Sequence, residues 1–200
     1  MDSSHKLSWA LGLLFGFLLL PASAGFSQVS PAEMASPRLK SAEQTYFAQL
    51  RAMSRAFQET KFPYELVLSR YAGLDPKEQE AADRRGLEFV PFRNRVVLKV
   101  SGNYNAAFNS SLLTQNQRAK GVFDEVIVPI LKLIPKYFPS QPSFDGFGFE
   151  ISYHVRSQDS GYDYEGKEIL ALVLDKAGLL TYLGARNDIQ RQEVLNGSEI

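Results

Sequence analysis

Four polar residues with chemically useful side chains alternate with apolar residues between positions 147 and 156. They are Glu150, Ser152, His154 and Arg156. In a β-strand, side chains two positions apart lie on the same face, about 6–7 Å from one another. A carboxylate, a hydroxyl, an imidazole and a guanidinium on one face could bind a carboxylate or phosphate group, or transfer a proton. The same pattern is typical of a solvated strand face whose charges pair with neighbouring strands, and alternation by itself favours this second interpretation.

Any catalysis at this strand depends on His154. The other histidine, His5, lies in the N-terminal leader described below, and the chain has no cysteine. One histidine without thiols excludes the usual zinc ligand sets and two-histidine metal centres, and no cofactor is expected. A Ser–His–acid triad is disfavoured, because GxSxG is absent and Ser152 lies too far from His154 on a flat strand. The enzymatic hypothesis that remains is a hydrolase or transferase using His154 and Glu150.

The segment that follows this strand is acidic. Residues 157–167 predict a polar loop with three hard oxygen ligands for a calcium ion, Asp159, Asp163 and Glu165. Their spacing does not match an EF-hand, which favours a solvated hairpin loop. A GxxxxGK pattern also ends at Lys167. A phosphate loop needs Ser or Thr next and then a helix, whereas here a glutamate and a predicted strand follow, so we reject that match.

Periodicity predicts the elements that hold these residues. Helices are predicted over Ser41–Glu59, Pro76–Arg85, Ser110–Ile134 with a kink at Pro129, Ala177–Gly184 and Asp188–Leu195. Strands are predicted over Leu87–Phe92, Arg95–Ser101, Phe147–Val155 and Glu168–Asp175, while Lys61–Gly73 is ambiguous. Two strand pairs around a long helix predict an α+β domain. Its sheet is expected to be mostly antiparallel, with about four strands and helices packed on one face.

The N-terminus predicts the compartment. Leu7–Leu20 is an almost unbroken apolar run, and Ala22-Ser23-Ala24 follows with the spacing that signal peptidase recognises. The run would make about 21 Å of helix, short of the roughly 30 Å hydrocarbon core of a bilayer. We therefore expect a signal peptide over residues 1–24, cleaved near Ala24, and a periplasmic or extracellular protein. Membrane contact is expected only if the leader stays uncleaved.

Composition limits what the exported chain can do. Residues 25–40 are rich in proline, serine and small residues and predict a flexible tether before a single domain over 41–200. The chain has 22 Lys and Arg against 22 Asp and Glu, and loss of Asp2 and Lys6 with the leader leaves 21 of each. A neutral chain lacks the basic surface that nucleic acids require. Without cysteine there are no disulfides, so the domain depends on its apolar core.

One short stretch resembles the OmpA-like peptidoglycan-binding domains. It consists of Val96–Ser101, followed by a helix with Leu113 and Arg118 near its start. In that family an arginine at the helix start helps to hold a peptide carboxylate, and the resemblance implies this role for Arg118. The spacing from Leu113 to Arg118 is one residue longer than in the family, and Gly102-Asn103 stand where its aspartate is expected.

Two longer segments, Gly86–Phe108 and Phe144–Arg156, are similar to segments of uncharacterised exported bacterial proteins. This resemblance implies a bacterial envelope location and no particular activity. The leader, the neutral charge and the lack of a specific catalytic motif favour a non-catalytic binding or envelope-associated protein with an envelope or extracellular partner. The alternatives are the His154/Glu150 enzyme and a divergent peptidoglycan-binding domain.

Overall fold

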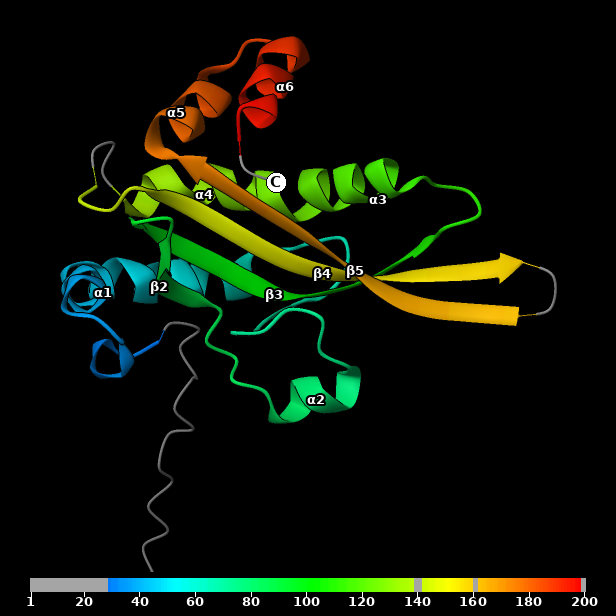
Figure 1. The fold of residues 1–200 in the computed structure, drawn as a ribbon, viewed down its shortest axis with the longest axis horizontal. Coiled ribbons are helices and arrows are strands. Elements are labelled where there is room, and N and C mark those ends of the chain that lie inside the picture. Colours follow the sequence, from blue (N-terminus) through cyan, green and yellow to red (C-terminus); the bar gives the residue numbers. More distant parts are fainter. Residues whose placement is uncertain (1–28, 139–141, 160–161, 199–200) are drawn as a thin grey trace, which may run out of the picture.

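Two long strands that run parallel, β3 (Arg95–Asn109) and β4 (Gly146–Asp159), form the centre of the fold. The computed structural model describes residues 29–138, 142–159 and 162–198. On the far side of β4, β5 (Tyr162–Asp175) pairs antiparallel with it. On the far side of β3, β2 (Leu87–Phe92) and the short β1 (Leu66–Leu68) pair antiparallel with successive parts of that strand. The five strands make one sheet (Figure 1).

The sheet is therefore mixed, and the prediction of a mostly antiparallel sheet was wrong. The four predicted strands are present, although β3 continues to Asn109, past its predicted end at Ser101. The helical segment between β3 and β4 is a crossover connection. It returns the chain to the same end of the sheet, so that the two strands it joins run parallel. The fifth strand, β1, comes from the stretch whose pattern was ambiguous. The α+β class is confirmed, with the long helices on one side of the sheet.

The crossover consists of three consecutive helical segments: α3 (Gln115–Val122), a π-helical turn (Phe123–Ile127) and α4 (Val128–Tyr137). The predicted irregularity near Pro129 takes the form of this π turn, in which Val128 donates its N–H to the carbonyl of Phe123. Proline cannot donate a helical hydrogen bond and crowds the preceding turn. The wider turn accommodates it, and the helix continues through Pro135.

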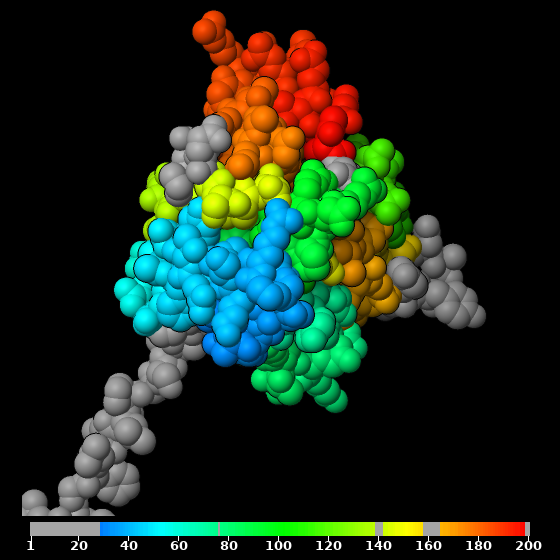
Figure 2. Space-filling model, turned by 60° about the vertical axis from the view of Figure 1, so that its left-hand side comes forward, coloured from blue at the N-terminus to red at the C-terminus, as the bar shows by residue number. Residues whose placement is uncertain are grey.

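The core lies between the sheet and the helices α1 (Pro37–Glu59) and α4. In Figure 2, α1 spreads across one side of the molecule, with α5 (Lys176–Gly184) and α6 (Asp188–Asn196) above it. Four apolar side chains at helical spacing on α1 are buried in this core: Tyr46, Leu50, Met53 and Phe57. The ring of Tyr46 lies 5.2–5.9 Å from three other aromatic rings, those of Phe89, Phe138 and Phe144.

The N-terminal boundary of the fold differs from the prediction. The helix α1 begins at Pro37 rather than at Ser41, because Ser36 caps it by accepting the N–H of Leu39. Before it, Val29 is fully buried and donates its N–H to the carbonyl of Leu87, 3.0 Å away. Residues 29–40 of the predicted tether are thus packed on the domain. The predicted signal peptide, residues 1–24, lies outside the described residues.

Two further boundaries also differ. The helix α2 (Pro76–Ala81) is shorter than predicted. Residues 157–167, predicted as a polar loop, belong mostly to β4 and β5, which pair as far as Asp159 and Tyr162. The pattern here is polar because the hairpin extends beyond the core. Within the described ranges, each helix is too short or too polar to span a bilayer.

Candidate functional site

The sheet has an open face, which we define as the face opposite α1 and α4. Alternate residues of β2 to β5 lie on this face, and the strand register places the four predicted residues there: Glu150, Ser152, His154 and Arg156. Their apolar neighbours on the same strand are buried in the core, as predicted. Three regions follow one another along the open face: a part covered by residues 69–75, a network of charges, and a hollow.

Asn103 fixes the covering segment to the sheet. Asn103 belongs to β3 and is only 2% exposed. Its Oδ1 accepts the N–H of Leu74 (3.0 Å) and the hydroxyl of Ser152 (2.7 Å), while its Nδ2 donates to the carbonyl of Tyr71 (3.2 Å). The hydroxyl of Ser152 is therefore bonded to Asn103 and buried, so that it is not presented as a nucleophile.

His154 lies at the margin of the same covered region. Its side chain is 17% exposed, and its Nδ1 is 3.8 Å from the Oε1 of Glu165. Lys167, beside it, donates to the carbonyl of Gly73 (3.1 Å) and pairs with Asp75. Burial, and then the charge of Lys167, lowers the pKa of His154. The neutral form of the imidazole is therefore favoured.

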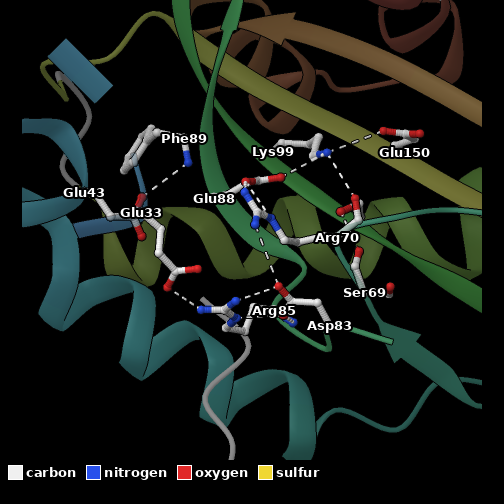
Figure 3. A network of polar contacts seen from close by, with 11 residues as sticks. Glu33, Glu43, Ser69, Arg70, Asp83, Arg85, Glu88, Phe89, Lys99 and Glu150 are labelled. Atoms are coloured by element: carbon white, nitrogen blue, oxygen red, sulfur yellow. Dashed lines mark hydrogen bonds and ion pairs between the residues drawn. The ribbon is translucent and has the colours of Figure 1, made fainter. Parts of the chain in front are cut away.

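The middle of the open face carries a network of ion pairs centred on Glu88 (Figure 3). Its Oε2 accepts two hydrogen bonds from Arg70, at 3.0 and 3.2 Å, and its Oε1 lies 3.2 Å from the Nζ of Lys99. Lys99 is also 3.7 Å from Glu150. The predicted Glu150 and His154 therefore belong to different clusters, about 13 Å apart at strand spacing, with the buried Ser152 between them.

The network continues into the chain that leads to β2. Arg70 lies 3.8 Å from Asp83, and Arg85 binds both Asp83 and Glu33. The hydrogen bond from Arg85 holds the pKa of Asp83 below its ordinary value. At Gly86 the backbone passes so close to β3 that a Cβ would lie 2.2 Å from the Ser101 carbonyl oxygen. These contacts are structural, because they clamp residues 69–86 onto the sheet.

Beyond Lys99 and Glu150 the open face is hollow, and we call this region the sheet hollow. Its volume is about 330 Å³. Its apolar side chains come from β2, β3 and β5: Val90, Phe92, Val97, Ala171 and Val173. Gly148 on β4 lies among them, and a Cβ there would meet Val97 and Val173 at 3.8 and 3.9 Å, which is ordinary van der Waals contact. The hollow thus exists because position 148 has no side chain.

Positive charge gathers at the end of the sheet hollow formed by the β2–β3 turn. The guanidinium carbons of Arg93 and Arg95 lie 5.5 and 5.3 Å from the ring centre of Phe92. Arg93 and Asn94 form the turn itself with φ of 44° and 64°, as two-residue hairpin turns of type I′ require. Sequence alone gave little sign of this site, since its only local signal was a glycine within an alternating strand.

Arg118, to which the OmpA-like resemblance gives a ligand-binding role, is occupied within the chain. It is 7% exposed and binds both carboxylate oxygens of Glu168 on β5 as well as the carbonyl of Leu113. The hydroxyl of Tyr153 donates to the same carboxylate, at 2.8 Å. The hydrogen bond from Arg118 lowers the pKa of Glu168. This partly buried pair ties α3 to the sheet.

The three calcium candidates are placed as follows. Asp159 ends β4 and Asp163 lies in β5, but their side chains are outside the part that the structure describes. Glu165 is exposed and pairs with Arg156, at 3.3 Å. Among the side chains that are described, no three of His, Cys, Asp or Glu lie close enough to hold a metal ion.

Comparison of the chain with protein-family models, with curated proteins and with solved structures found no significant match. The geometry of the open face is therefore the basis on which function is inferred.

Proposed function

We propose that this chain is an exported, non-catalytic binding domain whose ligand is an amphipathic anion. The apolar part of the ligand lies in the sheet hollow, and its anionic group lies beside Arg93 and Arg95. The observation that carries the proposal is the apolar hollow that Gly148 leaves open on the sheet. Export rests on the sequence of residues 1–24, which has the features of a signal peptide.

Size and polarity support this class of ligand. A volume of about 330 Å³ lies at the small end of the range for ligand sites. Covering the apolar floor with hydrocarbon gains roughly 25 cal/mol per Å² of buried apolar surface. Guanidinium groups are well suited to carboxylates and phosphates because they bind them with paired hydrogen bonds. Lys99 lies at the other end of the sheet hollow, where it pairs with Glu88 and Glu150.

The arrangement of the predicted catalytic residues supports binding over catalysis. His154 and Glu150 lie in separate clusters, and the hydroxyl of Ser152 is bonded to Asn103. Substitution of His154, which lies outside the sheet hollow, by alanine is expected to leave the binding of dodecanoate, the probe used below, unchanged. A hydrolytic activity on envelope substrates that disappears in both His154→Ala and Glu150→Ala would overturn the non-catalytic proposal.

Dodecanoate is a suitable probe for the hollow, with binding measured by isothermal titration calorimetry on the chain without residues 1–24. In the variant Gly148→Leu the new side chain fills the hollow, so we expect binding to be lost while the melting temperature is kept. Gly184→Leu is the matched control, because a Cβ at Gly184 has open space around it. Absence of dodecanoate binding, or equal binding by Gly148→Leu, would contradict the proposal.

The role of the positive end is tested with Arg93→Asn. Asparagine adopts the left-handed conformation of this turn readily, so the hairpin is kept while the charge is removed. We expect dodecanoate to bind about tenfold more weakly, as loss of one charge-assisted hydrogen bond implies. Dodecanol, which has the same chain without the charge, should bind the variant and the native protein equally.

A further inference from the structure

The two edges of the sheet are treated differently, and the edge at β2 is closed. The carbonyl of Leu87 accepts the N–H of Val29 at 3.0 Å. The N–H of Phe89 donates to the Oε2 of Glu43 at 3.3 Å. Next along the strand, Pro91 has no N–H to offer. These are the devices by which proteins prevent another strand from pairing with an exposed edge.

The opposite edge, at β5, has no such cover. The backbone hydrogen bonds found for the described residues of this strand all run to β4, and none joins its outer side to another segment. Ile169 is 51% exposed and Ala171 is exposed as well, although both lie within a strand. The stretch Ile169–Leu174 contains no charged residue. A long apolar edge of this kind is a site where another strand pairs.

We propose that a second copy of this chain pairs with β5 in antiparallel fashion, so that one continuous sheet crosses a two-fold axis at Ala171. In this register Ile169 of each copy lies opposite Val173 of the other, and Lys167 lies opposite Asp175. All of these side chains are on the open face, where β-branched pairs and opposite charges stabilise neighbouring strands. This association does not depend on whether the sheet hollow binds a ligand.

The pattern of residues selects both the partner and the register. In a two-fold antiparallel pair, each strand faces a reversed copy of its own sequence. For β5, the facing residues are complementary only when the axis passes through Ala171. If the axis passed through Ile169, Glu165 would lie opposite Val173 and Lys167 opposite Ala171, so that each charged side chain would face an apolar residue of the partner strand. An axis through Val173 would place Asp175 opposite Ala171. A two-fold contact of this kind uses the same surface on both copies, as most homodimers do.

The absence of native cysteine allows a direct test of the register. The chain without residues 1–24 is prepared with a single substitution, Ala171→Cys, and oxidised mildly. Directly opposite residues have Cβ atoms about 4.5–5.5 Å apart, so we expect a disulfide dimer to form quickly. Ile169→Cys should form it much more slowly, because its opposite residue is Val173. Ile189→Cys, at a position on α6 that is 73% exposed, reports random collision.

Sedimentation equilibrium tests the association without a cross-link. We expect the native chain to shift from monomer to dimer as its concentration rises. Ile169→Lys should keep it monomeric, because a lysine on an edge strand opposes pairing, whereas Ile189→Lys should behave as native. Circular dichroism confirms that both variants fold. A native chain that is monomeric at every concentration, or Ala171→Cys cross-linking no faster than Ile189→Cys, would overturn the proposal.

Discussion

Glu43 is a buried carboxyl group that covers the edge of β2 and is destabilised when it is charged. Its carboxyl group is fully buried between α1 and β2, where Oε2 accepts the N–H of Phe89 while Oε1 has no hydrogen-bond partner among the described residues. Burial, together with the nearby charge of Glu88, raises the pKa of Glu43 to about 7. The residue covers a strand edge, but its charged form is destabilised by burial, so the protonated form is favoured in the folded chain.

This pKa predicts how stability depends on pH. Between about pH 4.5 and pH 7 the folded chain holds a proton on Glu43 that the unfolded chain has released, so the free energy of unfolding should fall as the pH rises. The variant Glu43→Gln should lose this slope and gain up to about 3 kcal/mol at pH 8 relative to the native chain. Urea unfolding at pH 5 and pH 8 measures the difference.

Glu59→Gln is the control for that experiment, since Glu59 is exposed at the end of the same helix. It should keep the slope of the native chain. If Glu43→Gln also keeps the slope, the buried carboxyl is not its source.

At the scale of elements, local patterns identified most of the segments but not the way they join. Periods of two and of nearly four residues placed β2 to β5, α1 and the crossover helix close to where they lie. The parallel pairing of β3 with β4 was missed, because hydrogen-bond register joins residues far apart in the sequence. The stretch that contains β1 was ambiguous, because the strand is only three residues long and its sequence does not alternate.

The segment over residues 69–75 is held by one buried side chain, and its release can be predicted. Asn103→Ala removes both the acceptor for Leu74 and the donor for Tyr71, so we expect the free energy of unfolding to fall by about 2–3 kcal/mol. Amide exchange at Leu74 should speed up. Because burial is the main cause of the low pKa of His154, that pKa should rise toward 6.5, as NMR titration would show.

Asn105→Ala provides the comparison. Asn105 also lies on β3, but it is exposed, and its side chain donates to the carboxylate of Glu65. Its substitution should change neither the exchange of Leu74 nor the titration of His154. Equal effects of the two variants would mean that Asn103 does not anchor the segment.

At the scale of the whole molecule, the site was harder to predict than the fold. The polar face of β4 was apparent from alternation, and the four polar residues do share that face. What they contact was not apparent, because residues 69–86 come from another part of the chain and cover some of them. The sheet hollow requires β2, β3 and β5 to be aligned beside Gly148, and no local pattern carries that alignment.

The extent of the domain gives a further prediction. A chain that begins at Ser36 keeps the cap of α1 but lacks Val29 and the Glu33–Arg85 ion pair. Burial of one valine side chain is worth about 1.5–3 kcal/mol, so this chain should unfold at a lower temperature than one that begins at Gly25. Differential scanning calorimetry of the two chains measures the change. Equal melting temperatures would show that residues 29–35 are not part of the folded unit.

The outer edge of β2 is blocked by Val29, Glu43 and Pro91. This block also limits the number of copies that can join edge to edge. Once two copies have joined through β5, each outer end of the combined sheet presents a blocked strand or the three-residue β1, so growth terminates at two. A dimer of this kind can use an exposed strand for pairing without forming fibres. By the same reasoning, a substitution that uncovers β2 would turn a closed pair into the repeating unit of a polymer.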